Sequence, residues 1–162
     1  MESNQLSIEK LKKLQFKVMV DVAASALVPL MRIGDKLNLF IKLDELGPVT
    51  TDELAVASEV DERYLREWLS AMAAAGFVMY IKEQRKFFLS PEQSAVFARE
   101  ESGAMMMGAY DFLSGSYQME DAVRHAFQTG EGIPYAKHCP ACFRGTARFF
   151  RPAYQKNLIQ NW

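Results

Sequence analysis

Residues 61–89 read DERYLREWLSAMAAAGFVMYIKEQRKFFL, and the spacing of the apolar side chains changes partway along this stretch. The segment Glu62–Ala75 carries them at helical spacing, and Gly76 follows at the position of a helix C-terminal glycine. Phe77–Ile81 and Phe87–Leu89 are rich in aromatic and branched residues and flank a polar turn. The stretch therefore predicts a helix followed by a β-hairpin.

A second, shorter helix is predicted upstream of this one. Thr50 and Glu53 have the spacing of a capping box, in which each residue's side chain caps a backbone amide of the other. Downstream of the hairpin, Ser90-Pro91 starts another helix, because serine caps N-termini and proline fits the first turn. Helix, helix and hairpin in this order predict a winged helix-turn-helix.

Helices are also predicted on both sides of this unit. On the N-terminal side, helical spacing covers Leu6–Val22, and a second helix follows Pro29 and ends before Gly47. On the C-terminal side the predicted helices are Ser102–Tyr117, Met119–Gln128 and Arg144–Trp162, the last kinked at Pro152. We expect a mainly α fold with a small β-hairpin, in which a winged helix-turn-helix carries N-terminal and C-terminal helical extensions. The expected regions are N-terminal helices in residues 1–46, the winged helix-turn-helix in 47–98, and a helical region in 99–162.

Composition and the N-terminus indicate a folded cytoplasmic protein. The 162 residues are 49% hydrophobic and 24% charged, and the net charge is −1. The chain does not open on a basic segment followed by a long apolar run, which a secretory signal would require. The longest nearly uncharged apolar stretch, Val22–Met31, is too short to span a bilayer. We expect a cytoplasmic location and no membrane partner.

The charge of the winged helix-turn-helix argues against a nucleic acid partner. Between Thr50 and Ser90 there are seven acidic and five basic side chains. Three of the acidic ones, Asp61, Glu62 and Glu67, lie in or cap the helix that would enter a major groove. Affinity for DNA depends largely on basic contacts to phosphate, so this helix would be repelled. We expect no nucleic acid partner, although the basic hairpin turn keeps a DNA-binding regulator as an alternative.

Two short motifs resemble known sites but lack the required context. Cys139 and Cys142 have the spacing of a metal or redox pair, and His138 adjoins them. A zinc site needs about four ligands, and His125 is the only further histidine. A redox pair of this kind belongs near a βαβ unit, which the sequence does not predict. We expect two reduced thiols and no metal, and we interpret Gly130-Glu131-Gly132 as a connection because it follows a helix and lacks a third glycine.

Methionine and aromatic residues are concentrated between Met105 and Phe150. Such side chains can line a pocket for a planar apolar ligand, and they also form cores and subunit interfaces. A chain of this length has limited core to cover every apolar helix surface. The apolar residues of the first predicted helix and Met105–Met107 therefore predict a homodimer.

Three segments together resemble the N-terminal half of the class I S-adenosylmethionine-dependent methyltransferases that have a winged-helix N-terminal domain. They are LMRIGDKLNLF (residues 30–40), DERYLREWLSAMAAAG (61–76) and FRGTARFFRPAY (143–154). The resemblance runs from about Val18 to Trp162, and Arg63–Gly76 is its most specific part.

The resemblance implies a protein of two parts. In that family the N-terminal part dimerises and roofs the substrate pocket, while a Rossmann-like part binds the methyl donor S-adenosylmethionine. This chain has no strand–Asp-x-Gly-x-Gly–helix pattern, so we expect it neither to bind S-adenosylmethionine nor to catalyse methyl transfer alone. We expect a homodimer that contributes to binding a small-molecule methyl acceptor. The alternatives are a winged-helix transcriptional regulator with a ligand-sensing helical extension and a stand-alone dimeric interaction module.

The resemblance also implies ligand contacts in the loop before the final helix and in that helix. Aromatic rings are suited to this role because they hold a flat acceptor with few rotamers to freeze. The candidate substrate-binding residues are Tyr110, Tyr117, His125, Tyr135, His138, Phe149, Tyr154 and Asn157. His125 or His138 could take the acceptor's proton, and no residue is assigned as catalytic. Phe149 and Tyr154 could equally pack the final helix.

Overall fold

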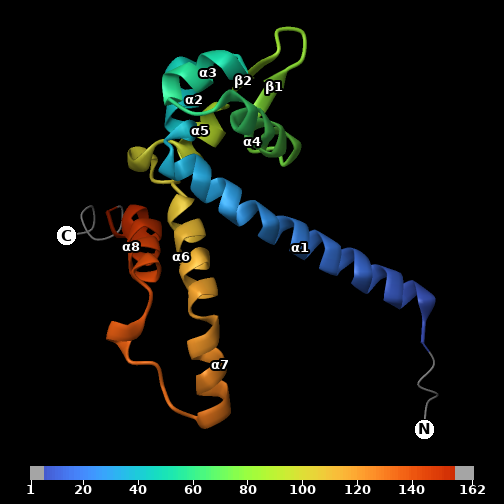
Figure 1. The fold of residues 1–162 in the computed structure, drawn as a ribbon, viewed down its shortest axis with the longest axis vertical. Coiled ribbons are helices and arrows are strands. Elements are labelled where there is room, and N and C mark those ends of the chain that lie inside the picture. The colour runs from blue at the N-terminus through green and yellow to red at the C-terminus, as the bar shows by residue number, and fades with distance from the viewer. Residues whose placement is uncertain (1–5, 156–162) are drawn as a thin grey trace.

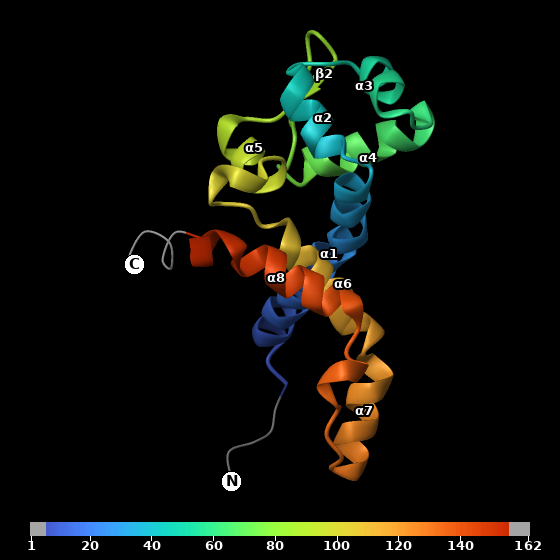
Figure 2. The same ribbon diagram turned by 90° about the vertical axis from the view of Figure 1, so that its left-hand side faces the viewer.

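A computed structural model of the chain describes residues 6–155, and it is mainly helical with one small sheet (Figure 1). The expected fold class is therefore confirmed. The winged helix-turn-helix lies at one end, and a long N-terminal helix and a C-terminal helical extension both run away from it, diverging from each other (Figures 1 and 2). The elements are α1 (Ile8–Lys36), α2 (Leu39–Leu46), α3 (Thr51–Ser58), α4 (Glu62–Ala74), β1 (Met79–Ile81), β2 (Lys86–Phe88), α5 (Pro91–Phe97), the 3₁₀ turn η1 (Glu100–Ser102), α6 (Met107–Gln118), α7 (Glu120–Thr129), the 3₁₀ turn η2 (Tyr135–Lys137) and α8 (Pro140–Tyr154).

Helix α1 passes through Pro29 without a break, so the prediction of a new helix after this proline was wrong. A proline inside a helix removes one hydrogen bond, but here Val28 and Met31 on either side are buried in the body of the protein. This burial offsets the lost bond. The chain instead turns after α1 at Asn38, whose φ of 56° lies in the left-handed region that asparagine tolerates.

The exposed part of α1 is apolar enough to raise the question of a membrane. By length and composition alone α1 could cross a bilayer, since its apolar character extends well beyond Val22–Met31. One such helix is weak evidence for a span, because core helices of soluble proteins and N-terminal signal sequences meet the same criteria of length and composition. Lys17 and Asp21 also form an ion pair of 2.5 Å on the projecting segment.

Local capping chemistry explains the winged helix-turn-helix. The Thr50 hydroxyl accepts from the Glu53 amide at 3.3 Å, and the Glu53 carboxylate accepts from the Thr50 amide at 2.8 Å. The predicted capping box is therefore confirmed, and these bonds hold the pKa of Glu53 below its usual value. After α4, Gly76 has a φ of 76°, which is the left-handed C-terminal position predicted for it. Ser90 caps α5 in the same way as Thr50 caps α3.

The hairpin is shorter than predicted, because Phe77 and Val78 lie outside β1. Their amides both donate to the carbonyl of Met72 at the end of α4, which holds them in the helix C-terminal turn. Strands β1 and β2 are antiparallel, with Tyr80 opposite Phe87. Phe87 also exchanges two backbone hydrogen bonds with Val49, so the segment before α3 extends the wing.

Trp68 links α4 to α1 through the core. Its indole N–H donates to the carbonyl of Leu30 at 2.8 Å, and its ring meets Phe40 edge-on at 5.1 Å between centroids. A Cβ added at Gly34 would collide with both rings, so only glycine lets α1 approach this closely. The core around them includes Met31, Leu39, Phe40, Leu43, Leu54, Leu65, Trp68, Leu69 and Met72.

Met105 and Met107 belong to this core, with exposures of 3% and 1%. The prediction that Met105–Met107 provide exposed apolar surface for a dimer was therefore wrong for Met105 and Met107. Of the three, only Met106 is exposed. Methionine fits here because its flexible side chain fills an irregular gap between the winged helix-turn-helix and α6.

A further ion pair fixes the segment that leads to α6. Arg99 donates to both carboxylate oxygens of Asp44 at 2.7 and 2.8 Å, which joins the residues after α5 to α2. The hydrogen bonds and the positive charge of the Arg99 guanidinium stabilise the ionised carboxylate and so lower the pKa of Asp44.

Candidate functional site

Helices α6 and α8 cross at very short range, and this crossing creates the candidate site (Figure 2). A Cβ added at Gly145 would lie 2.8 Å from the Gly108 carbonyl oxygen, and one at Gly108 would lie 2.7 Å from the Gly145 carbonyl oxygen. A Cβ at Gly115 would lie 2.7 Å from the Cys142 amide nitrogen. The three glycines therefore bring the two backbones together, and the larger side chains are displaced to the edge of the crossing.

Two adjoining hollows lie along that edge and together form a surface that we call the aromatic groove. Their volumes are about 440 and 400 Å³, and they share Phe112 and Thr146. The first is lined by Ala109, Phe112, Leu113, Thr146, Phe149 and Phe150, and the second by Phe112, Tyr135, His138, Cys142, Phe143, Thr146 and Ala147. Almost all of these side chains are apolar or aromatic, so the groove suits a flat apolar ligand.

One end of the groove carries two of the predicted site residues. The Tyr135 ring lies 4.7 Å from Phe143 and 6.1 Å from the His138 imidazole, measured between centroids. Tyr135 and His138 lie in and just after η2, and Phe143 lies in the first turn of α8. The loop before the final helix and the start of that helix, where ligand contacts were predicted, thus lie side by side.

The other end carries one more, Phe149, and the predicted residue Tyr154 lies beside the groove without lining it. Phe149 and Phe150 meet edge to face at 5.1 Å, and Phe150 lies 6.2 Å from Tyr154 on the next turn of α8. Phe149 is half-buried in the groove, whereas the Tyr154 side chain is 59% exposed beside it. Neither end is covered by another element among residues 6–155.

The remaining predicted residues lie elsewhere. Tyr110 packs against the hydrophobic core, and burial raises the pKa of its hydroxyl. Tyr117 lines a separate hollow with Val123 and Phe127. His125 is exposed on α7, with its Nε2 atom 3.9 Å from the Glu131 carboxylate. Asn157 lies outside the described residues.

Phe112, Cys142 and Thr146 are groove residues that the sequence analysis did not select. Cys142, Thr146 and Phe150 recur every four residues on α8, which is the spacing of one helix face. This signal was missed because α8 begins at Pro140, with proline at the first helical position, and not at Arg144 as predicted.

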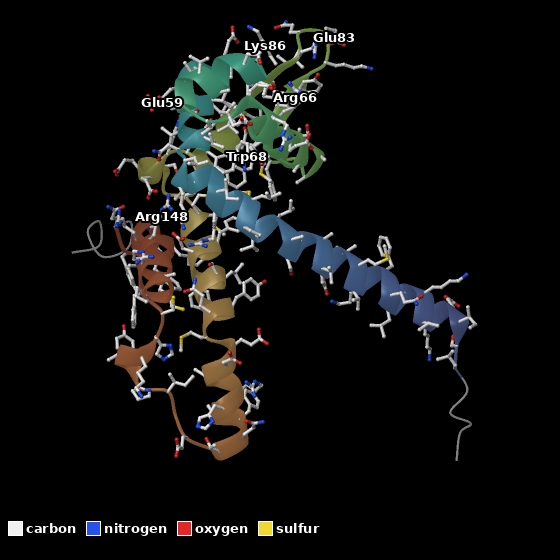
Figure 3. All side chains as sticks on the ribbon, in the orientation of Figure 1. Glu59, Arg66, Trp68, Glu83, Lys86 and Arg148 are labelled. Atoms are coloured by element: carbon white, nitrogen blue, oxygen red, sulfur yellow. The ribbon has the colours of Figure 1, made fainter. Side chains whose placement is uncertain are left out.

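An ion-pair network holds the crossing against the end of α1. Arg148 on α8 donates to both carboxylate oxygens of Asp35 at 2.6 and 2.8 Å, and it also pairs with Glu100 (Figure 3). Arg32, one turn before Asp35, pairs with Asp111 of α6 at 3.2 Å. These side chains are mostly shielded from solvent, and the two carboxylates raise the pKa of Arg148 despite its burial.

The basic side chains of α4, the would-be reading helix, are exposed but interact with neighbours on the same helix. Arg66 pairs with Glu62 at 2.5 Å, the Arg63 guanidinium stacks over Tyr64 at 5.0 Å, and Asp61 caps the helix (Figure 3). Both basic residues of this helix thus have partners within it. The arrangement does not favour the alternative of a DNA-binding regulator.

The fold defines this chain as a winged helix-turn-helix protein with helical extensions, and comparison with known proteins refines that class. Residues 23–99 match the model of the Rv2258c-like winged HTH domain. Among curated proteins, none matches the sequence.

The similar solved structures are methyltransferases. The chain superposes on mitomycin 7-O-methyltransferase with a TM-score of 0.68 at 16% identity, covering 93% of this chain and 47% of that one. It superposes on human N-acetylserotonin methyltransferase in complex with SAM with a TM-score of 0.63 at 13% identity, covering 96% of this chain and 47% of that one. For N,N-8-amino-8-demethyl-D-riboflavin dimethyltransferase from Streptomyces davawensis the TM-score is 0.52 at 22% identity, and the superposition covers 96% of this chain and 46% of that one. The chain thus has the fold of the N-terminal region of these enzymes and spans about half their length.

The described residues do not fit S-adenosylmethionine. A donor site of the Rossmann type needs a parallel strand followed by a glycine-rich turn and a helix. Residues 6–155 contain one sheet, and its two strands are antiparallel. Gly130–Gly132 follows helix α7 and not a strand. We therefore derive no methyl transfer step from this part of the chain.

Proposed function

We propose that this chain is the dimerising and substrate-binding N-terminal region of a methyltransferase that acts on a small molecule in the cytoplasm. The observation that carries the proposal is the aromatic groove on a fold otherwise found in the N-terminal regions of methyltransferases. S-adenosylmethionine would be bound by a separate Rossmann-like domain. The chain alone would be inactive, because its described residues offer no donor site.

The projecting part of α1 supports dimerisation. Leu14, Val18 and Val22 lie four residues apart on one face, and each is more than half exposed. Phe16 and Met19 are about as exposed, whereas Lys10, Lys13, Lys17 and Asp21 gather on the opposite side of the helix, so the segment is amphipathic with a broad exposed apolar face. A soluble monomer seldom leaves so much contiguous apolar surface open to water. A second copy of the same helix would cover this apolar face, because its length and its apolar residues match those of the first.

We expect the purified chain to sediment at twice its mass of 18.4 kDa at micromolar concentration. The double substitution Leu14→Gln and Val18→Gln should raise the dimer dissociation constant by about 100-fold or more, because two apolar side chains per copy lose their burial. The matched control, Lys12→Gln with Lys13→Gln, alters the same helix at residues that are charged already. A wild-type chain that sediments as a monomer, or a control that dissociates as readily as the apolar variant, contradicts the proposal.

Acceptor binding is tested in the chain joined to a Rossmann-like domain that binds S-adenosylmethionine. Tyr154→Ala should raise the KM for the acceptor by about tenfold and leave the affinity for S-adenosylmethionine unchanged, since an aromatic contact contributes about 1–1.5 kcal/mol. Phe127→Ala is the control, because Phe127 is an equally large and even more exposed ring outside the groove.

Two results would contradict this role of the groove. Equal effects of the two substitutions on the acceptor KM would show that the groove has no special part in binding. A large loss of thermal stability in Tyr154→Ala would show that Tyr154 packs α8 and does not contact a ligand.

A further inference from the structure

The cysteine pair at the start of α8 has a geometry that the sequence did not disclose. Cys139 is the N-cap of α8, Pro140 is its first residue, and Cys142 is the third. The Cys142 amide donates to the Cys139 carbonyl at 2.9 Å, so the backbone closes a tight turn between the two residues. In such a turn the two Cα atoms are less than about 7 Å apart, which overlaps the range that a disulfide requires.

Both thiols face the same side of α6. The Cys139 Sγ atom donates to the side-chain oxygen of Gln118, the last residue of α6, at 3.0 Å. Cys142 rests on Gly115, one turn earlier, where an added Cβ would lie 2.5 Å from its Sγ atom. Burial and then the neighbouring Cys139 thiol raise the pKa of Cys142. Both sulfur atoms thus lie against the same helix, and both side chains remain partly accessible to solvent.

We propose that Cys139 and Cys142 form a reversible disulfide, and that its formation alters the Tyr135–His138 wall of the aromatic groove. Reactive cysteine pairs of this spacing lie at helix N-termini. Cys139 is the N-cap of α8, so this pair has such a position although no βαβ unit is near it in residues 6–155. The proposal is independent of any methyltransferase role.

The oxidant is a small-molecule disulfide such as oxidised glutathione. The Cys139 thiolate attacks it, forms a mixed disulfide and releases one reduced glutathione. The Cys142 thiol then loses its proton and its sulfur attacks the Cys139 sulfur, which releases the second glutathione. Two protein thiols are oxidised to one disulfide, and one glutathione disulfide is reduced to two thiols.

The groove is affected because the same residues form its wall. Cys142 lines the groove with Tyr135 and His138, and His138 is bonded to Cys139 in sequence. The disulfide removes the Cys139 S–H donor, so the hydrogen bond that ties the residue after His138 to Gln118 of α6 is lost.

The test incubates the full chain with oxidised glutathione, quenches with an alkylating reagent and measures intact mass. The wild type should lose the mass of two hydrogen atoms and carry at least about tenfold less glutathione adduct than Cys142→Ser, in which the mixed disulfide cannot be resolved. Gln118→Ala should oxidise faster than the wild type, because it frees the Cys139 thiol. Adducts in the wild type at the level of Cys142→Ser, or a disulfide that links two chains, overturn the proposal.

The effect on the groove has its own measurement. On oxidation, the ring resonances of His138 should shift in the NMR spectrum by more than those of His125, which lies on α7 and serves as an internal reference. Disulfide formation with no shift at His138 overturns the coupling to the groove.

Discussion

Arg148→Met should lower the free energy of unfolding by about 3 kcal/mol, which is the cost of breaking a shielded ion pair by removing one partner. Methionine keeps most of the side-chain length, so the loss comes from the charge and its hydrogen bonds. Asp35 and Glu100 would both keep their charge without the guanidinium that now pairs with them. Thermal unfolding followed by circular dichroism should show a midpoint lower by about 9 °C.

Arg66→Met is the matched control for this prediction. Arg66 also pairs with a carboxylate, Glu62, but its side chain is 59% exposed and the pair lies within one helix. Its loss should cost less than about 0.5 kcal/mol. Combining Arg148→Met with Asp35→Leu should recover part of the lost stability, because one unpaired charge is removed. Equal effects of the two arginine substitutions would show that the Arg148 network adds nothing to the stability of the fold.

Gly145→Ala should destabilise the chain by about 2 kcal/mol or more, although alanine is the better helix former by about 1 kcal/mol. The new methyl group would meet the Phe112 Cα atom and the Gly108 carbonyl oxygen, each at 2.8 Å. These are backbone atoms and cannot rotate away, so α6 and α8 would have to separate. Urea unfolding monitored by circular dichroism measures the change.

Gly132→Ala is the control for the glycine substitution. A Cβ at Gly132 meets nothing within 4 Å, so the stability should change by no more than about 0.5 kcal/mol. If Gly145→Ala were as stable as the wild type or more stable, helix propensity would outweigh the close approach, and the described crossing of α6 and α8 would be wrong.

The winged helix-turn-helix could be predicted because local chemistry determines its element boundaries. Thr50 with Glu53, Gly76, and Ser90 with Pro91 act on backbone groups within a few residues, so their effect is readable from sequence spacing. The predictions failed where distant contacts decide. Pro29 is accommodated because residues around it are buried by elements far along the chain, and no local pattern reports that burial.

The aromatic groove could be predicted only in part. Tyr135, His138, Phe149 and Tyr154 were selected for their side-chain chemistry and lie in the groove or beside it. Tyr110, Tyr117 and His125 have the same chemistry but lie elsewhere, because the crossing of α6 and α8 determines which helix faces converge. That crossing depends on the approach of Gly108 to Gly145 and of Gly115 to Cys142, which are far apart in sequence, and no single-sequence rule pairs them.

The ion pairs of Arg32 and Asp35 also make a mechanical connection between two parts of the protein. Both residues lie in the last two turns of α1, and they hold α6 and α8 respectively. A twist or tilt of the projecting part of α1 would therefore act on both ion pairs at once, and through them on the two helices whose crossing forms the groove.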